Sequence, residues 1–440
     1  MKALFALALF FALGLGLTWH ALRWPMTFDD LHLIRPFRAS ELLAAWSGHW
    51  DPDGLETPGL RPLSLAFNHA RAVLCGESVA AHRLLLVALF ALDLALLVPL
   101  GARVGLAAGA AVAAGALMLC TRYSAYHLVW ITDGNHLVQG LAFLLAALWT
   151  VDGLALSSRG RLAASVAAIT AGVLVREDTL GAMPALVLIA LAKGPRRRAL
   201  AHAAALAVTA AALLVWRRLA VPAAQPLGLD LGGFARAVAH AFDPVGVSGF
   251  DLQSALLARG FWVVLALTVA GLVVLRDLSA ARWSGRWAAA AVAACASGFL
   301  LQRDDLLFFP SLFVSLFLAT AWSAMWRAWP RARPVVAAAF LWSAGGGAWT
   351  GAVLAENFHP QSARAVDWDT EFLYGRYAAA TIPPERRARV AAQLDLLGVR
   401  AGEEPRQQVR ALVTEAKAAG RRRPASDGRV FFPRLPERYF

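Results

Sequence analysis

Long apolar runs constrain this chain more than any other feature of its sequence. Runs of roughly 15 to 22 apolar residues recur along most of its length, and a helix of that size, rising 1.5 Å per residue, crosses a hydrocarbon core about 30 Å thick. Lipid offers backbone amides no hydrogen-bond partners, so such runs must form helices. Only 16% of the residues are charged, against roughly 25% in an average soluble protein. The sequence therefore predicts a polytopic membrane protein.

We expect an all-α fold with about eleven membrane-spanning helices. The first run follows a lysine, as a signal peptide would. It is longer than a usual signal core and lacks a clean small-x-small cleavage site, so we interpret it as a retained helix. The predicted spans are 3–22, 82–100, 105–120, 137–151, 162–175, 179–192, 199–219, 260–275, 287–301, 306–326 and 334–354.

The connectors between these spans alternate in charge. One set carries most of the clustered arginines, including KGPRRR at 193–198 and WRAWPRARP at 326–334, whereas the short connectors of the other set hold only Arg122, Arg176 and Arg303. Because arginine-rich loops stay in the cytoplasm, this pattern places the N-terminus there. It also explains the net charge of +13 without a nucleic-acid partner.

Three longer segments then fall outside: residues 23–81, 220–259 and 356–440. In the first, residues 40–50 and 61–74 are predicted to form short amphipathic helices at the membrane interface, with Trp46, Trp50 and Phe67 at headgroup depth. We divide the chain into a transmembrane domain, 1–355, and a small helical tail, 356–440. The tail is expected on the outer side, although one miscounted helix would reverse that assignment.

Several well-known catalytic motifs are missing from the sequence. There is no Walker lysine loop, no GxGxxG after a strand, no HExxH and no GxSxG. The three cysteines have neither CxxC nor metal-binding spacing. Any chemistry must therefore be assembled from polar residues at the membrane boundary.

Such residues gather at the outer helix ends. Placing a charged group near hydrocarbon costs free energy. Several such groups on one side of the membrane therefore indicate a functional site rather than ordinary helix-end side chains that extend toward water. Adjacent carboxylates such as Asp29 and Asp30 disfavour double ionisation and keep a base available, although such a pair also occurs in solvated loops and helix caps. The set comprises Asp29, Asp30, Arg61, Arg122, TDGNH at 132–136, REDT at 176–179 and QRDD at 302–305.

Three stretches resemble the GT-C superfamily, the membrane glycosyltransferases that use polyprenyl-phosphate sugars and include protein O-mannosyltransferases. FDD at 28–30, followed by the segment from Arg61 into the second span, is similar to the start of that fold. VREDTLGAMP resembles its Lys-Glu hairpin, with Arg176 in place of lysine and Glu177 matching. QRDDLLFFPS resembles its Arg-Tyr-x-x-x-Pro-Ser segment, with Asp304 where an aromatic residue is common. The resemblance covers roughly residues 1–355 and excludes the tail.

The resemblance implies an inverting glycosyltransferase at the periplasmic face of the bacterial inner membrane. It would move a sugar from a polyprenyl-phosphate donor to a hydroxyl of a lipid, polysaccharide or protein acceptor, with membrane lipids around it. An acidic base in the first outer loop maps to Asp30 or Asp29, with Asp30 preferred. Guanidinium groups suit the leaving phosphate. The phosphate-binding candidates, in order, are Arg303, Arg176, Arg122 and Arg61, with Glu177, Asp304 and His136 in supporting positions.

Some alternatives stay open. No residue is assigned to a metal, since isolated histidines at a membrane edge, such as His127 and His136, usually pack or bond to water. A divalent cation is still possible, with Asp133, Asp304 and Asp305 as oxygen donors. Asp93 either lies at membrane depth and faces the helix bundle, or lies near the end of a helix whose bounds are predicted wrongly. A transporter with polar groups near the midplane, or a catalytically inactive relative acting as a scaffold, are the competing functions.

Overall fold

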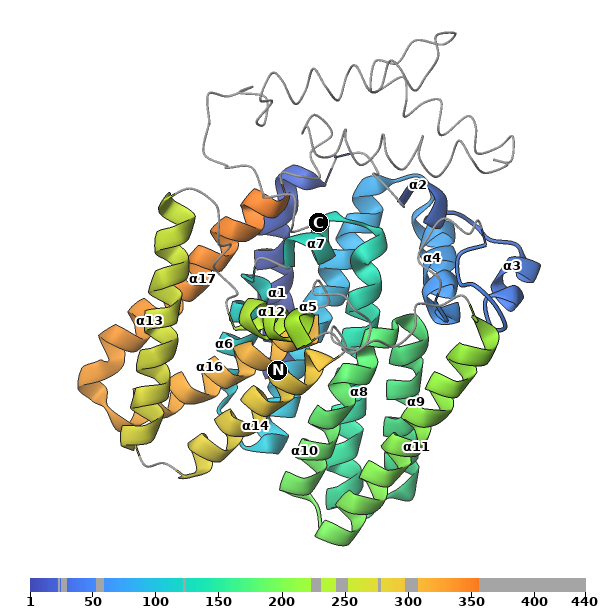
Figure 1. The fold of residues 1–440 in the computed structure, drawn as a ribbon. Helices are drawn as coiled ribbons and strands as arrows, with labels where there is room; N and C mark the ends of the chain where they lie inside the picture. The colour runs from blue at the N-terminus through green and yellow to red at the C-terminus, as the bar shows by residue number, and fades with distance from the viewer. Residues whose placement is uncertain are drawn as a thin grey trace.

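The computed structural model describes residues 1–22, 24, 30–52, 59–121, 124–222, 231–242, 252–275, 278–296 and 308–355. Helices and turns make up these residues, with no strand among them, as Figure 1 shows. The predicted all-α class is therefore confirmed. The expectations for the tail, 356–440, fall outside the described residues.

Every predicted apolar span contains a helix. Differences at the ends amount to a few residues in most cases, because helix termini depend on local capping as well as on hydrophobicity. The elements are α1 Lys2–Thr18, η1 Trp19–Ala21, α2 Asp30–Leu33, α3 Ala39–Ala44, α4 Pro62–Cys75, α5 Val79–Val104, α6 Ala108–Leu119, α7 Ser124–Val129, η2 Thr132–Gly134, α8 Asn135–Ala155, α9 Arg159–Val175, η3 Glu177–Ala182, α10 Met183–Lys193, α11 Arg196–Ala220, α12 Leu231–Ala241, α13 Leu252–Leu275, α14 Leu278–Ala294, α16 Phe308–Ala328, η4 Pro330–Ala332 and α17 Arg333–Ala355.

Five helical segments of the described chain are long and apolar enough to cross a membrane, which makes this a membrane-embedded helical protein. Two of the other predicted spans, 105–120 and 179–192, are shorter in the structure. Helices α6 and α10 have 12 and 11 residues, and thus reach about 18 Å or less at 1.5 Å per residue. The five candidate spans are Lys2–Ala21, Val79–Val104, Thr132–Ala155, Arg196–Ala220 and Phe308–Ala328.

Helix α5 is central to the packing and contacts α1, α6 and α8. The Ser78 hydroxyl caps its first turn by accepting the Ala81 N–H at 3.3 Å. It ends at Gly105, whose φ of 89° is left-handed and favours glycine. Asp93 is only 2% exposed and its carboxylate faces Gly140 of α8. Asp93 is therefore bundle-facing, although within the described chain its oxygens have no hydrogen-bond partner.

The remaining helices pack around this centre. Helix α8 lies along α9, α10 contacts α8, α11 and α14, and α16 packs on α14 and α6. Residues Phe308 to Ala321 of α16 are buried without a break. Helix α17 approaches the end of α6 so closely that a Cβ on Gly347 would lie 2.0 Å from the Cys120 carbonyl oxygen. Small residues permit such close backbone approach in membrane bundles.

Three of the arginine-rich connectors come together at one end of the bundle. Arg103, at the end of α5, pairs with Asp152 of α8 at 2.7 Å, and Arg161 of α9 lies 3.4 Å from the same carboxylate. Arg198 of α11 donates to Ser157 nearby. The opposite ends of α5 and α8 adjoin α2, α4 and α7 (Figure 1). Of the polar residues singled out for function, those that the structure describes lie at that opposite end: Asp30, Arg61, His136, Arg176 and Glu177.

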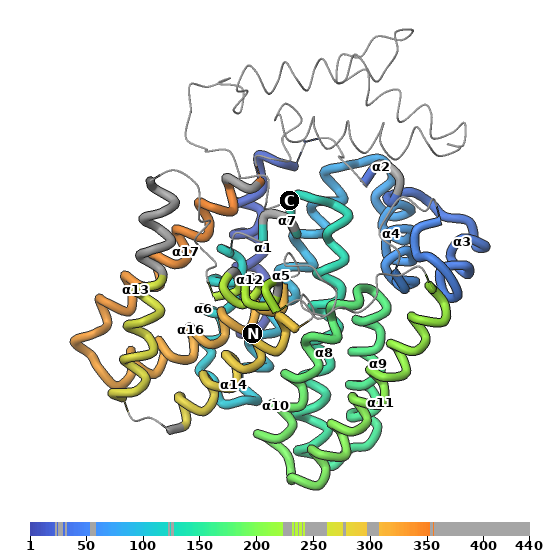
Figure 2. Tube along the Cα trace, viewed as in Figure 1, coloured from blue at the N-terminus to red at the C-terminus, as the bar shows by residue number. Residues whose placement is uncertain are grey.

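The predicted amphipathic helices of the first long segment are present, with changes. Helix α4 matches the 61–74 prediction, whereas α3, Ala39–Ala44, is shorter than the 40–50 prediction. Trp50 is buried at 3% exposure rather than at the interface. Trp46 is half-exposed and stacks on Trp216 of α11. Figure 2 traces this blue segment beside the ends of α9 and α11, which are far from it in sequence.

The buried face of α4 is partly polar, although the helix is predicted to be amphipathic with an apolar buried face. Leu74 is 80% exposed, while Asn68 and Arg71 are buried. The Arg71 guanidinium donates to the Ile131 carbonyl and to Asn68. Hydrogen bonds thus compensate the burial of these polar groups, and the helix uses its polar face to hold the turn before α8.

Candidate functional site

A carboxylate between two imidazoles lies at the start of α8. The turn that links α7 to α8 carries Asp133, whose Oδ2 is 2.8 Å from His127 Nδ1 and whose Oδ1 is 3.2 Å from His136 Nε2. Asp133 and His136 are three residues apart and so share a helical face. All three side chains are buried or nearly so, with Asp133 the most exposed at 12%.

A second acidic residue reaches the same cluster from the turn after α9. Arg176 Nε lies 3.3 Å from Asp178 Oδ1, and Arg176 Nη1 lies 3.9 Å from Asp133 Oδ1. Gln139 joins the two elements, since its Nε2 donates to Asp178 at 3.2 Å and lies 2.7 Å from His136 Nδ1. The Thr179 hydroxyl donates to the side-chain amide oxygen of Gln139 at 2.9 Å. The network therefore fixes side chains from α8 and η3 relative to one another.

The pKa of Asp178 depends on two opposing effects, burial of the carboxyl and the neighbouring positive charges. Burial alone raises the pKa of this carboxyl, but the Arg176 guanidinium, His136 and the Gln139 hydrogen bond favour the charged form. Together they hold the pKa below its usual value. Asp178 is therefore a carboxylate at neutral pH and a fixed negative partner for Arg176.

Glu177 organises a neighbouring set of cations. Its Oε1 accepts the Leu60 N–H at 2.9 Å and the Arg217 Nε–H at 2.8 Å, and its Oε2 lies 3.9 Å from Arg61 Nη2. The Arg61 guanidinium lies over the Trp50 ring, 5.4 Å from its centroid. One buried carboxylate thus connects α11 and the start of α4 to η3.

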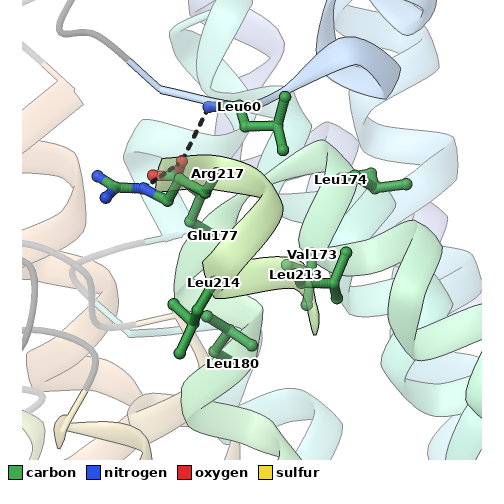
Figure 3. A pocket seen from close by; sticks show the side chains of 8 residues that line it. All are labelled: Leu60, Val173, Leu174, Glu177, Leu180, Leu213, Leu214 and Arg217. Carbon is green, nitrogen blue, oxygen red and sulfur yellow. Dashed lines mark hydrogen bonds and ion pairs between the residues drawn. The ribbon is translucent and has the colours of Figure 1, made fainter. Parts of the chain in front are cut away.

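A pocket opens beside Glu177 and Arg217, with an empty volume of about 240 Å³ including the open space at its mouth. In Figure 3 the carboxylate and guanidinium lie at one end and the aliphatic side chains line the rest. The pocket is therefore amphiphilic, with its polar end next to Arg61. The lining residues are Leu60, Val173, Leu174, Glu177, Leu180, Leu213, Leu214 and Arg217.

Asp30 contacts the turn that carries Asp133. Its Oδ1 accepts the Thr132 backbone N–H at 2.7 Å and also the Thr132 hydroxyl. Arg83 and Arg71 hold the same turn by donating to the carbonyls of Val129 and Ile131. Burial raises the pKa of Asp30, while the bonds from Thr132 and the charges of the two arginines oppose part of that rise. Asp30 is therefore a buried carboxyl that positions the turn.

The structure brings together four of the predicted site residues besides Asp30. Arg61, Arg176, Glu177 and His136 come from three separate segments. They belong to two adjacent sets of contacts, one around Glu177 and one around Asp178, which the consecutive residues 176–178 bring side by side. The other four predictions cannot be placed, since Asp29, Arg122, Arg303 and Asp304 lie outside the described residues.

The sequence-based selection missed four participants. The sequence predicts Asp133 only as an oxygen donor for a cation, and it predicts no role for Asp178 or His127. Arg217 was hidden inside a predicted span, although an arginine in the last turn of an apolar helix at the arginine-poor end is a usable signal. The pairing of these residues depends on contacts between distant segments, such as Leu60 with Glu177.

Comparisons with protein families, with curated proteins and with solved structures find no match to this chain. Any function assigned to the chain therefore rests on its own residues and on the geometry of the site.

Proposed function

We propose that the chain is an inverting glycosyltransferase of the GT-C type, which moves a sugar from a polyprenyl-phosphate donor to a hydroxyl acceptor. One observation carries the proposal. Arg61 and Arg176, which are far apart in sequence, lie beside buried carboxylates at the end of the bundle away from the arginine-rich connectors. Such an arrangement suits a phosphate that leaves at the headgroup plane.

Arg176 and Arg61 are the proposed phosphate-binding residues. Their side chains keep 11% and 14% exposure, so each guanidinium can be reached from one side while its carboxylate partner fixes the other. Planar guanidinium groups bind phosphate oxygens in pairs. Glu177 orients Arg61 and Arg217, and Asp178 orients Arg176. Arg303 and Arg122, the further candidates from the sequence, remain part of the proposal.

The first isoprene unit of the donor is proposed to enter at the amphiphilic pocket, whose aliphatic side chains have to move apart to admit it because the enclosed space holds little more than one water molecule. Its aliphatic walls come from α9, η3 and α11, and its polar end adjoins Arg61 through Glu177 (Figure 3). A polyprenyl phosphate has the same order of groups, with hydrocarbon next to an anion. The pocket therefore favours an amphiphilic donor over a water-soluble nucleotide sugar.

Asp30 is the proposed base, following the resemblance. It takes the proton of the acceptor hydroxyl, the acceptor oxygen bonds to the anomeric carbon from the opposite face, and polyprenyl phosphate leaves with the electrons of the broken bond. Burial raises the pKa of Asp30, which favours proton uptake near neutral pH. The carboxyl is 1% exposed, so the proposal requires the acceptor to displace the groups that cover it.

The finer membrane assignments belong to the same proposal. We propose a GT-C-like arrangement of about eleven spans in a bacterial inner membrane, with a cytoplasmic N-terminus and a periplasmic site. The alternation of arginine-rich connectors supports this orientation. The tail, 356–440, would cover the outer mouth and select the acceptor, which is tested by deleting it and measuring acceptor choice.

The test is turnover by the full-length protein in nanodiscs with a panel of polyprenyl-phosphate sugars and hydroxyl acceptors, followed by release of the lipid phosphate. We expect release with at least one donor. Asp30→Asn should lower it by about 100-fold or more, as expected for loss of a general base, and Arg176→Ala should also lower it. Arg103→Ala, which alters an exposed pair at the opposite end, serves as the control.

Two results would oppose the proposal. No release from folded protein with any donor and acceptor would contradict the transferase function. Full turnover by Asp30→Asn would contradict the assignment of the base while leaving the donor site standing.

A further inference from the structure

Three potential metal ligands converge at the start of α8. One donor atom each from His127, Asp133 and His136 lies within 4.8 Å of the other two. A tetrahedral ion with bonds of about 2.0 to 2.2 Å needs donors roughly 3.3 to 3.5 Å apart. The three donors therefore lie near the spacing that such an ion needs, and binding requires only short shifts of the side chains.

The turn that presents these ligands is held in place by other residues. Asp30 accepts two hydrogen bonds from Thr132, directly before Asp133. Arg83 donates to the Val129 carbonyl, two residues after His127. These bonds do not use the ligand atoms. The site is therefore preorganised, which lowers the cost of binding an ion.

Side chains that orient the His136 ring are also present. Its Nδ1 lies 2.7 Å from the Gln139 side-chain nitrogen and 3.8 Å from Asp178 Oδ2, so its Nε2 is the atom directed at Asp133. A histidine that binds metal through one nitrogen usually has a carboxylate, carbonyl or water at the other. Asp178 is the carboxylate on that side of the ring, whereas the Gln139 nitrogen is itself a donor and has to move away when Nδ1 carries the proton.

His127 provides an independent observation. The ring is 4% exposed, and its Nε2 is buried with no hydrogen-bond partner in the part of the chain that the structure describes. The ring packs edge-on against Phe308, with centroids 5.1 Å apart. A buried ring nitrogen without a hydrogen-bond partner is costly when the ring serves packing alone, so His127 is expected to have a role beyond packing.

The donor set selects the class of ion. Two imidazole nitrogens and one carboxylate oxygen suit zinc and neighbouring first-row metals, whereas magnesium and calcium prefer oxygen donors throughout. Within the described residues there are three protein ligands, which leaves a fourth position open, as in catalytic rather than structural zinc sites. The carboxylates of Asp133 and Asp178 balance the positive charge of the ion and of Arg176.

We propose that His127, Asp133 and His136 bind one divalent ion of the zinc class, with an open coordination position at the membrane-boundary site. This inference stands on the ligand geometry and is independent of the transferase proposal. It replaces the expectation that the histidines only pack.

The test uses the full-length protein without a histidine tag, treated with a chelator and reloaded with Zn²⁺ or Co²⁺. We expect about one bound ion per chain by elemental analysis, in line with a single three-ligand site, and a visible Co²⁺ absorption band that Zn²⁺ removes. His127→Gln and Asp133→Asn should each abolish the band. Asp178→Asn should weaken binding by about 10- to 100-fold, as measured for outer partners elsewhere.

His202→Gln is the matched control, because His202 is also a buried histidine but contacts Thr150, away from the cluster. Size-exclusion profiles and thermal unfolding show whether each variant is folded. No bound ion in folded wild-type protein, or unchanged binding in a folded His127→Gln variant, overturns the proposal. If both ligand variants unfold, the Co²⁺ spectrum of the wild-type protein tests the proposal instead. A band typical of water-coordinated Co²⁺ means that these side chains do not bind the ion, which overturns the proposal.

Discussion

At the scale of single residues, Glu177 joins three segments of the site. It is the carboxylate of a buried pair with Arg217, whose side chain is 9% exposed, and it also accepts the Leu60 N–H. Breaking a buried pair leaves an uncompensated charge. Glu177 therefore stabilises the contact between η3, α11 and the segment before α4.

We predict that Glu177→Ala lowers the free energy of unfolding by about 3 kcal/mol, the usual cost of removing one partner of a buried pair. Asp152→Ala is the control, because its partner Arg103 is 37% exposed, and it should cost less than about 1 kcal/mol. Unfolding in mixed detergent measures both. Equal losses in the two variants would show that Glu177 does not anchor these segments.

Asp30 gives a prediction about pH. Burial raises its pKa above the ordinary value of 3.8, so between that value and the raised pKa the folded protein binds the proton that the unfolded chain releases. Stability from this group is complete below the ordinary pKa and is lost as the pH rises through the raised one.

Asp30→Asn removes this titration while keeping an oxygen that can accept from Thr132. We therefore expect the wild-type protein to gain stability relative to Asp30→Asn when the pH is lowered from 7.5 to about 4, by the linkage between proton binding and folding. The midpoint of thermal unfolding, measured for both proteins across this range, tests the prediction. A constant difference between them, or a gain in the opposite direction, would contradict the raised pKa.

At the scale of helices, the contact of α17 with the end of α6 depends on one small residue. A Cβ on Gly347 would meet the Cys120 carbonyl, which is backbone and cannot rotate away, whereas a Cβ on Gly345 would meet nothing within 4 Å. Gly347→Ala should destabilise the protein by about 1 to 3 kcal/mol, as overpacking does. Gly345→Ala should be neutral or stabilising by up to about 1 kcal/mol, since alanine favours helices.

Unfolding of the two alanine variants under identical conditions measures the difference. If Gly347→Ala is as stable as Gly345→Ala, the two helices do not approach as closely as the structure has them.

Helices were predictable from sequence because each depends mainly on a local apolar run. The apolar spans and α4 required only periodicity, hydrophobicity and Pro62 at the first helical position. The packed face of α4 was not predictable, because burial of Arg71 depends on the Ile131 carbonyl from a distant segment. Lengths of membrane spans were overestimated for α6 and α10 because hydrophobicity alone does not fix where a helix ends.

For the site, the sequence predicted several of the residues but not which of them contact one another. Arg61, Arg176 and Glu177 were selected as outer polar groups, and they do lie together. Asp133 and Arg217 acquire importance only through distances to Arg176 and Glu177. Such distances follow from helix packing, which no single segment encodes.

At the scale of the whole molecule, the two ends of the bundle have different chemistry. Arg103, Arg161 and Arg198 gather at one end, whereas Arg61, Arg176 and their carboxylates lie at the other. The positive-inside bias then predicts opposite sides of the membrane for the two ends.

Cysteine labelling in intact cells measures this orientation. In a variant without Cys75, Cys120 and Cys295, we expect Glu77→Cys, at the site end, to react with an impermeant maleimide. Arg159→Cys, at the arginine-rich end, should react only after the membrane is permeabilised. Both positions are exposed in the structure. Labelling of both from the same side would contradict the two-sided arrangement, and the reverse pattern would contradict the proposed orientation.

The most direct measurement is a cryo-EM structure of the full-length protein in nanodiscs with polyprenyl phosphate, the lipid product of the proposed reaction. We predict phosphate density within hydrogen-bonding distance of the Arg176 and Arg61 guanidinium groups, with the prenyl chain entering between α9 and α11 beside Glu177. Lipid phosphate bound elsewhere, or absent from this site at saturating concentration, would contradict the assignment of this network as the donor site.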